Sequence, residues 1–149
     1  RWSSTLEEAW ELVSTLRSNR DATLEIEAAG SEVALELDRF RMVQVFRILL
    51  ENSLAACTDP VRIRVWLESG VVSPSDSVRI VFEDNGPGLS AEAKRHIFEP
   101  FFTTKTKGTG LGMAIALRLV DAHAGRIAWV ETNERGARFE ITLPGTRSV

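Results

Sequence analysis

Two glycine-containing segments hold the residues of this chain whose types and spacing best suit binding chemistry. The first, Asp84-Asn85-Gly86-Pro87-Gly88, directly follows an alternating apolar run. A carboxylate at the end of a strand can accept a hydrogen bond from an exocyclic amine such as that of adenine. Gly86 and Gly88 let the backbone turn sharply and approach a flat base. Because Asp-Asn-Gly is also a common hairpin turn, this segment alone leaves both interpretations open.

The second segment, Gly108-Thr109-Gly110-Leu111-Gly112, precedes an apolar helical pattern that starts at Met113. Successive backbone N–H groups at the start of a helix form an anion site, which the helix dipole strengthens. The segment is not a P-loop, and Met113 stands where a dinucleotide-binding fingerprint has its third glycine. The alternative is a flexible linker before a helix.

Cationic and hydroxyl side chains stand just before the second glycine segment. Lys105 and Lys107 alternate with Thr104 and Thr106. Such a segment beside an anion site suits a polyphosphate. An ordinary solvated loop would have the same composition.

A long amphipathic helix, expected over residues 38–57, carries Asn52 on the flank of its apolar stripe. The amide oxygen of Asn52 can ligate Mg²⁺, whose other ligands are usually waters and phosphate oxygens. Glu51 stands beside it and could hold a water of the metal. The alternative is an asparagine at a helix edge next to an exposed glutamate.

The elements that must position these residues follow from the apolar periodicity. A first helix is expected over residues 5–18, with Ser4 or Thr5 as its cap. The order predicts an α/β (α+β) two-layer sandwich, with helices on one face of a sheet. The other expected elements are strands at 22–27, 33–37, 61–67, 78–82, 126–131 and 137–143, a loop at 69–77, helices at 91–98 and 111–122, and a polar segment at 99–109.

Composition narrows the class of protein. The chain has 149 residues, 44% hydrophobic and 26% charged, which predicts one globular domain over residues 1–149. Its net charge of −3 does not fit a nucleic-acid binder, and it has no apolar run long enough to cross a membrane. The single cysteine suits a reducing compartment, and with two histidines it argues against structural zinc. We therefore expect a cytoplasmic domain without nucleic-acid or membrane contact.

Four segments, in order, resemble the sequence boxes of the ATP-binding domain of bacterial sensor histidine kinases. The resemblance runs over residues 38–144, and the Pro-Phe-Phe-Thr-Thr-Lys wording is typical of the nitrogen-regulation-like branch. Residues 136–139 and 143–144 also resemble the last glycine turn and strand end of that family. The four boxes are the N box at Gln44–Ala56, the first glycine box at Asp84–Leu89, the F box at Ile97–Lys105 and the second glycine box at Gly108–Ala116.

The resemblance implies the Bergerat fold, a sandwich with a mixed, mostly antiparallel sheet and a mobile lid over ATP. It implies a protein-histidine kinase domain that binds ATP and Mg²⁺. The γ-phosphate would pass to a histidine on a phosphoacceptor dimerisation domain, which this chain lacks, and then to a response regulator. The parent protein would be either membrane-anchored or soluble.

The resemblance also assigns roles to individual residues. Asn52 would bind Mg²⁺, and Asp84 would recognise the adenine amine above a floor shaped by Gly86 and Gly88. Phe101 and Phe102 would pack the lid. The catalytic residues would be Asn52, Glu51 and Lys105, and the triphosphate would be wrapped by Lys105, Gly108, Thr109, Gly110, Leu111 and Gly112.

Three departures from the family pattern bear on the chemistry. Ile48 stands where many sensor kinases have a second asparagine and where gyrase-type ATPases have a general-base glutamate, so we expect phosphotransfer rather than hydrolysis. Ala137 and Arg138 stand where small hydroxyl residues often lie near adenine. Neither His96 nor His123 has the sequence context of a phosphoacceptor. The alternatives are a free-standing anti-sigma-factor serine kinase, a gyrase-like ATPase domain and a degenerate nucleotide sensor.

Overall fold

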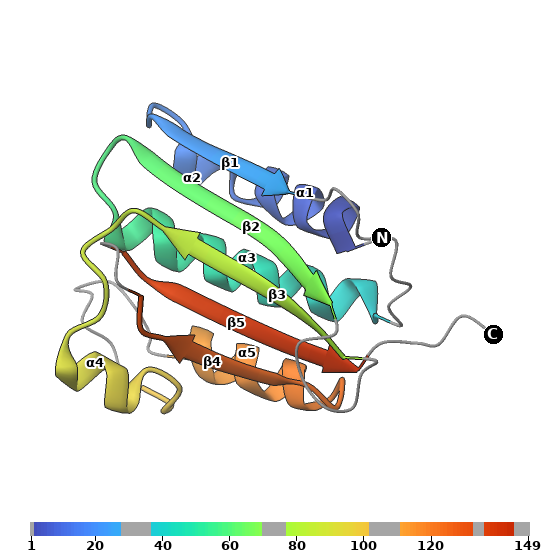
Figure 1. Ribbon diagram of the computed structural model, residues 1–149. Helices are drawn as coiled ribbons and strands as arrows, with labels where there is room; N and C mark the ends of the chain where they lie inside the picture. Colours follow the sequence, from blue (N-terminus) through green and yellow to red (C-terminus); the bar gives the residue numbers. More distant parts are fainter. Residues whose placement is uncertain (1, 28–36, 70–76, 102–110, 133–135, 145–149) are drawn as a thin grey trace.

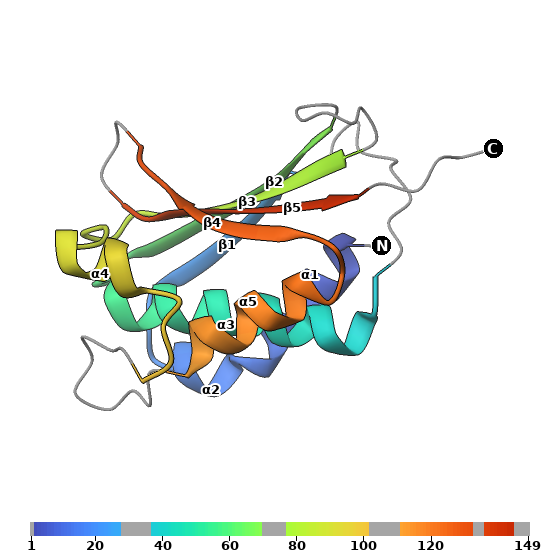
Figure 2. The same ribbon diagram turned by 90° about the horizontal axis from the view of Figure 1, so that it is seen from below.

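A five-stranded sheet with helices on one face forms the framework of the protein. The computed structural model describes residues 2–27, 37–69, 77–101, 111–132 and 136–144. Its two layers are plain when the sheet is viewed edge-on (Figure 2). The strands are β1 (Ala22–Glu27), β2 (Val61–Ser69), β3 (Ser77–Asp84), β4 (Arg126–Val130) and β5 (Arg138–Pro144), and the helices are α1 (Trp2–Leu12), α2 (Ser14–Arg17), α3 (Arg39–Ala56), α4 (Ala91–His96) and α5 (Gly112–Asp121).

The strand order is β1-β2-β3-β5-β4 (Figure 1). The β1 and β2 strands pair in parallel, and the other three neighbouring pairs are antiparallel. Parallel neighbours need a crossover connection, which α3 supplies between β1 and β2. The predicted mixed, mostly antiparallel sheet with helices on one face is confirmed.

Alternation along the strands decides which face the helices cover. In β2, Val61, Ile63 and Val65 are buried, whereas Arg62 and Arg64 are exposed. Because successive side chains of a strand point to opposite faces, one face of the sheet is apolar and the other charged. The α1, α3 and α5 helices pack on the apolar face, so the core lies between the two layers (Figure 2).

The α3 helix occupies the middle of the helical layer. The Asp38 side chain accepts a hydrogen bond from the Arg41 N–H at 3.2 Å, which caps its first turn. Phe46 in its fully buried stripe meets Phe82 of β3, with ring centroids 5.6 Å apart. At the other end, the Arg20 guanidinium donates to the carbonyl oxygens of Leu54 and Cys57. Both ends of the helix are therefore held by side chains.

The predicted first helix was wrong in its start and its continuity. Helix α1 already begins at Trp2 and ends at Leu12, and a short second helix follows Val13. Ser4 and Thr5 lie inside α1, so neither caps its start, and Thr5 is buried. An earlier start lets the helix bury Trp2 in the core, and the apolar area gained favours it over the capping signal.

The other predicted elements are found close to their expected bounds. The β2–β3 hairpin is confirmed by the antiparallel pairing of Ser69 with Val78. The expected strand at 33–37 lies outside the described residues except for Leu37, which is not in a strand. Within the described part of the chain, no helix combines the length and the hydropathy needed to cross a membrane.

Candidate nucleotide-binding site

The predicted binding residues that the structure describes gather at one end of the sheet. There β3 ends at Asp84, β5 begins at Arg138 and α3 ends at Ala56. The α4 helix and the start of α5 lie at the same end, on the left in Figure 1. Segments far apart in the sequence thus border one region beside the apolar face of the sheet.

Asp84, the last residue of β3, is 8% exposed and is surrounded by hydrogen-bond donors. Its Oδ1 atom accepts from the backbone N–H groups of Gly86 at 3.0 Å and Ala137 at 3.1 Å. Its Oδ2 atom accepts from the Ser53 hydroxyl at 2.8 Å. A buried carboxylate is costly unless donors replace the lost water, and these three do so. Among the described residues, no lysine or arginine forms an ion pair with Asp84.

Three glycines make room for the backbone around Asp84. A Cβ atom on Gly136, which has φ +129°, would lie 1.9 Å from the Asp84 carbonyl oxygen. A Cβ on Gly86 would lie 2.7 Å from the Cys57 sulfur atom, and Gly88 has φ +79° and faces the Gly136 carbonyl. Two turns therefore cross where no side chain fits. The expected approach of Gly86 and Gly88 to a flat base stays a prediction.

Asn85 joins the first glycine turn to the start of β2. Its Oδ1 atom accepts from the Arg62 N–H at 2.9 Å, and its Nδ2 atom donates to the Pro60 carbonyl at 2.8 Å. Both ends of the amide are used within the protein. Asn85 therefore fixes the turn rather than offering a group to a ligand.

Cys57, directly after α3, lies against the same turn. It is 4% exposed. Burial, the negative charge of Asp84 and a hydrogen bond with that side chain together raise the pKa of its thiol to about 12, and burial is the largest cause. The thiol therefore stays neutral and fills the space beside Gly86.

Asn52 lies on the side of α3 that faces the start of α5. One turn earlier, the Ile48 Cγ2 atom is 3.4 Å from the position that a Cβ of Gly112 would take. Residues four apart share a helix face, so half-buried Asn52 is directed toward the same region. The neighbouring Glu51 carboxylate instead pairs with Arg47, with 2.7 Å between Nε and Oε1.

The second glycine segment is only partly described. The α5 helix begins at Gly112 without a side-chain cap, and Leu111 is the residue before it. Phe101 is 76% exposed and has φ +67°. The predicted residues Phe102, Lys105, Gly108, Thr109 and Gly110 lie outside the described residues.

Comparison with known proteins assigns this arrangement to a family. The family described as "Histidine kinase-, DNA gyrase B-, and HSP90-like ATPase" matches residues 37–147. The chain belongs to this family. The expected family and fold class are both confirmed.

The similar proteins are sensor kinases. Sensor protein TdiS of Thauera aromatica is 29% identical over 83% of this chain and 23% of its own length. Sensor protein kinase PilS of Pseudomonas aeruginosa is 31% identical over 89% of this chain and 25% of its own. This chain thus spans about a quarter of these two curated relatives.

A solved structure extends the similarity to the whole fold. The catalytic domain of histidine kinase ThkA superposes with a TM-score of 0.80 at 31% identity, covering 95% of this chain and 91% of that one. ThkA has also been solved in complex with a response regulator, TrrA, at a TM-score of 0.77, 28% identity and coverage of 97% and 40%. This chain is therefore a histidine kinase-type ATPase domain.

Ala137, just before β5, and Arg138, at its start, are two of the positions where this histidine kinase-type domain departs from the family pattern, and the structure places them differently. Ala137 lies at the site, because its backbone N–H and carbonyl both bond to Asp84. Arg138 instead directs its guanidinium to the open face of the sheet, where Nε donates to Glu83 at 3.1 Å. Only the first of the two positions can bear on a bound base.

Both histidines of the domain are engaged in local structure. The Nδ1 atom of His96 lies 2.9 Å from a Glu99 carboxylate oxygen just after α4. At the end of α5, the His123 Nε2 atom accepts from the Asp38 N–H at 3.0 Å and Nδ1 lies 2.8 Å from the Leu119 carbonyl. Each histidine therefore contributes to the structure at the end of its helix.

Two side chains near Asp84 were missed by the interpretation of the sequence. Ser53 and Cys57 received no role, although they continue the spacing of Phe46 and Leu50 along the buried face of α3. A polar residue at this spacing is a signal that a buried polar partner lies opposite it on the sheet. That signal was present in the N box and would have found Ser53.

Proposed function

We propose that this domain binds Mg²⁺-ATP and donates the γ-phosphate to a histidine on a separate phosphoacceptor domain. The observation that carries the proposal is the Asp84 carboxylate, held by three neutral donors beside glycine turns. Oδ1 accepts two backbone N–H groups and Oδ2 accepts the Ser53 hydroxyl, and we propose that Oδ2 also accepts an exocyclic amine. Adenine carries its exocyclic amine on the ring carbon where guanine carries a carbonyl oxygen.

The phosphates would lie toward the start of α5. Uncapped N–H groups at a helix start attract phosphate, and Gly112 packs closely on Ile48, so no side chain stands between them. We include Lys105 and residues 108–112 in this phosphate site on the strength of the family resemblance. Lysine is a common phosphate-binding side chain because its ammonium group is a compact charge.

The residues present fit Mg²⁺ held mainly through the nucleotide. Asn52 offers the oxygen ligand that this ion accepts. Among the described residues, no cluster of three or more histidine, cysteine, aspartate or glutamate side chains could hold a metal by itself. Phosphate oxygens and waters would therefore complete the shell, and the ion would neutralise phosphate charge. Glu51 is paired with Arg47. We propose that its carboxylate also holds a water near the ion.

Ile48 favours transfer over hydrolysis. Its apolar side chain packs toward Gly112 at the start of α5 and cannot remove a proton from water. Phosphoryl transfer depends mostly on positioning and charge neutralisation. A site that binds ATP without activating water would hold the nucleotide until an acceptor arrives.

The proposed partners follow from the same reasoning. The acceptor histidine would belong to a phosphoacceptor domain of the parent protein, which normally dimerises, and the phosphate would then pass to a response regulator. The ThkA–TrrA complex is a precedent for such a regulator partner. We place this domain in the cytoplasm, and we propose no contact of this domain with nucleic acid or membrane.

Titration calorimetry with Mg²⁺-ATP tests the binding. The wild-type domain should bind, and Asp84→Asn should weaken binding about 10- to 100-fold, the range for losing a hydrogen bond to a charged group. The asparagine keeps an acceptor for Gly86 and Ala137 but turns an N–H group toward the adenine amine. Glu83→Gln is the matched control, because its side chain points to the opposite face. The proposal fails if the wild type does not bind or if both variants bind alike.

Transfer is tested with γ-labelled ATP and an added phosphoacceptor domain from a relative such as PilS. Acid-labile label should appear on the added domain and not on this chain. Strong acid-labile label on this chain alone would contradict the proposal.

A further inference from the structure

We propose that the Ser53 hydroxyl is a positioning group for base recognition, and that through Asp84 it sets how tightly the domain binds the exocyclic amine of adenine. The inference rests on the ATP-binding function proposed above. It adds a residue that has no place in the metal, glycine or lid contacts of that site. Its role is indirect, because it acts on the carboxylate that meets the base.

The geometry places Ser53 directly behind one carboxylate oxygen. Ser53 lies near the end of α3, and its Oγ is 2.8 Å from Oδ2 of Asp84 at the end of β3. An ionised carboxylate only accepts, so the hydroxyl must donate. At this length it is an ordinary O–H···O hydrogen bond to a charged acceptor, in a part-buried position. The hydroxyl therefore has one defined orientation.

The two oxygens of Asp84 are held in different ways. Oδ1 accepts two backbone N–H groups, from Gly86 and Ala137, and both belong to turns that glycines define. Oδ2 accepts the Ser53 hydroxyl, and the Cys57 thiol also forms a hydrogen bond with this carboxylate. Ser53 is therefore the hydroxyl donor to Asp84 that a substitution can remove without altering the backbone. It is also the donor on the oxygen left with capacity for a ligand.

Removal of the hydroxyl has a specific consequence for the ligand. With Ser53 present, one lone-pair direction of Oδ2 is occupied, and the carboxylate plane is fixed by donors from α3, from the turn after β3 and from the turn before β5. The amine then meets an oxygen that is already oriented, which lowers the ordering cost of binding. Without Ser53, Oδ2 takes up water or rotates, and this water must be displaced or reordered when adenine binds.

This mechanism predicts that Ser53 acts only on ligands that have the amine. Purine riboside triphosphate has the same ring, ribose and phosphates as ATP but carries no exocyclic amine. A general structural defect would weaken both nucleotides equally. A positioning role would weaken ATP alone, so the pair of ligands separates the two explanations.

The experiment compares the two nucleotides by calorimetry, with Mg²⁺, on four chains: wild type, Ser53→Ala, Ser53→Thr and Ser14→Ala. Ser53→Ala should weaken ATP binding about 5- to 10-fold and change binding of purine riboside triphosphate less than about twofold. Ser53→Thr keeps a hydroxyl and should restore most ATP affinity. Ser14→Ala removes an exposed hydroxyl from α2 and should change neither affinity.

The outcomes separate this inference from the proposed function. If wild type binds ATP and Ser53→Ala leaves ATP affinity unchanged, or weakens both nucleotides equally, the role of Ser53 is overturned and ATP binding stands. If wild type does not bind ATP, the proposed function itself is overturned.

Discussion

The two faces of the sheet treat charge in opposite ways, and adjacent residues of β3 show the difference. Asp84 points to the helix-covered face and is held by neutral donors alone. Glu83 points to the open face, where Arg138 lies 3.0 Å and Arg64 3.9 Å away. A carboxylate already paired with cations has little to offer a neutral amine. The carboxylate that has no cation beside it is therefore the one that we propose for recognition of the base.

The open face of the sheet carries more charged side chains than the helix-covered face, and we expect each of its ion pairs to contribute little to stability. A chain of ion pairs runs across four strands, and most of its members are solvent-exposed or half-buried. Two arginines also lie over the Trp66 ring, with Arg64 at 5.3 Å and Arg138 at 5.2 Å from its centroid. Exposed pairs contribute at most about 1 kcal/mol each. The pairs are Glu27–Arg64, Arg64–Glu83, Glu83–Arg138, Arg138–Glu140, Glu140–Arg79 and Arg79–Glu68.

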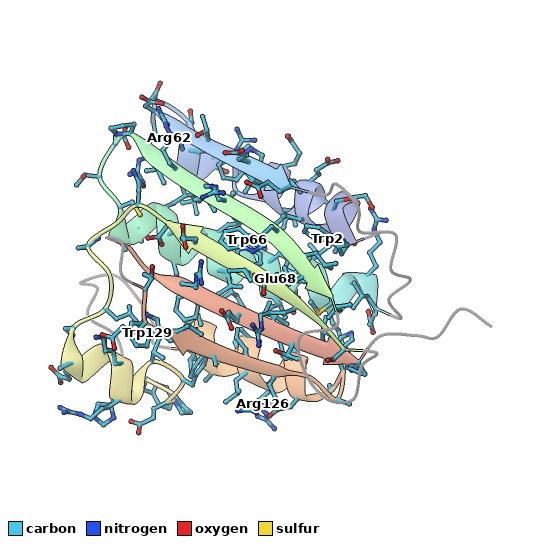
Figure 3. All side chains as sticks on the ribbon, in the orientation of Figure 1. Trp2, Arg62, Trp66, Glu68, Arg126 and Trp129 are labelled. Atoms are coloured by element: carbon cyan, nitrogen blue, oxygen red, sulfur yellow. The ribbon has the colours of Figure 1, made fainter. Side chains whose placement is uncertain are left out.

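A small apolar island lies among these charges. Val81 points to the open face but is 0% exposed, and its cross-strand partner is Trp66. The Trp66 indole N–H donates to Glu68 at 3.0 Å, and Figure 3 shows these two side chains together on this face. We therefore expect apolar burial, rather than ion pairing, to supply most of the stability on the open face.

The largest expected effect is on the ionisation of Cys57, beside the uncompensated charge of Asp84. Its pKa rises from 9.0 to about 12, mainly through burial, which is about a thousandfold in the ionisation constant. The pKa of the thiol is higher in the folded than in the unfolded state. The stability that the neutral thiol contributes to folding is therefore complete below pH 9 and is lost as pH rises toward 12. Thiolate absorbance at 240 nm measures it cleanly, since the chain has one cysteine and no tyrosine.

The folded protein should show no thiolate signal at pH 10, whereas the urea-unfolded chain should titrate near pH 9. A native midpoint near 9, below the onset of unfolding, would show that the ligand-side face does not desolvate its groups as described.

The next effect is at Gly136, which lies against Asp84 from the turn before β5. Gly136→Ala places a Cβ atom 1.9 Å from the Asp84 carbonyl oxygen at φ +129°. We expect a loss of at least about 3 kcal/mol in the free energy of unfolding, measured by urea denaturation. As a control, Gly112→Ala meets only Ile48 at 3.4 Å and should cost less than about 1 kcal/mol. Equal midpoints for these two variants would argue against the crossed turns.

Trp66→Ala should be the most damaging single truncation on the open face. It uncovers Val81 and removes the ring under two arginines, and we expect a loss of about 2 kcal/mol in unfolding free energy. Trp66→Phe keeps most of the apolar cover and should lose about half as much. If Trp66→Ala lowers the unfolding free energy less than a variant that removes an ion pair, the apolar island is not the source of stability on this face.

The smallest effect belongs to the ion pairs. The hydrogen bond and negative charge of Glu27 raise the pKa of Arg64 above its ordinary value, yet the guanidinium is exposed to solvent. Arg64→Gln should change the unfolding free energy by less than about 1 kcal/mol, and 1 M NaCl should reduce the difference. A loss of several kcal/mol that resists salt would erase the contrast between the faces.

Local sequence signals predicted the frame of the molecule well. The alternation of apolar and polar residues identified β2 and β3. Because the second alternating run leads into Asp84, it also placed a carboxylate at the end of a strand. The partners of that carboxylate were less accessible, because Ser53 and Ala137 lie 31 and 53 residues away along the chain. The first helix was predicted to start too late for the same reason, since the burial of Trp2 depends on the core and not on its neighbours in the sequence.

The wide separation of the donors has a consequence for synthesis of the protein. Asp84 accepts hydrogen bonds from Ser53 upstream, from Gly86 nearby and from Ala137 just before β5. A nascent chain that has not yet released residue 137 from the ribosome lacks one of these three donors and the turn at Gly136. Asp84 can therefore gain all three donors only after residue 137 has left the ribosome and β5 can pair with β3.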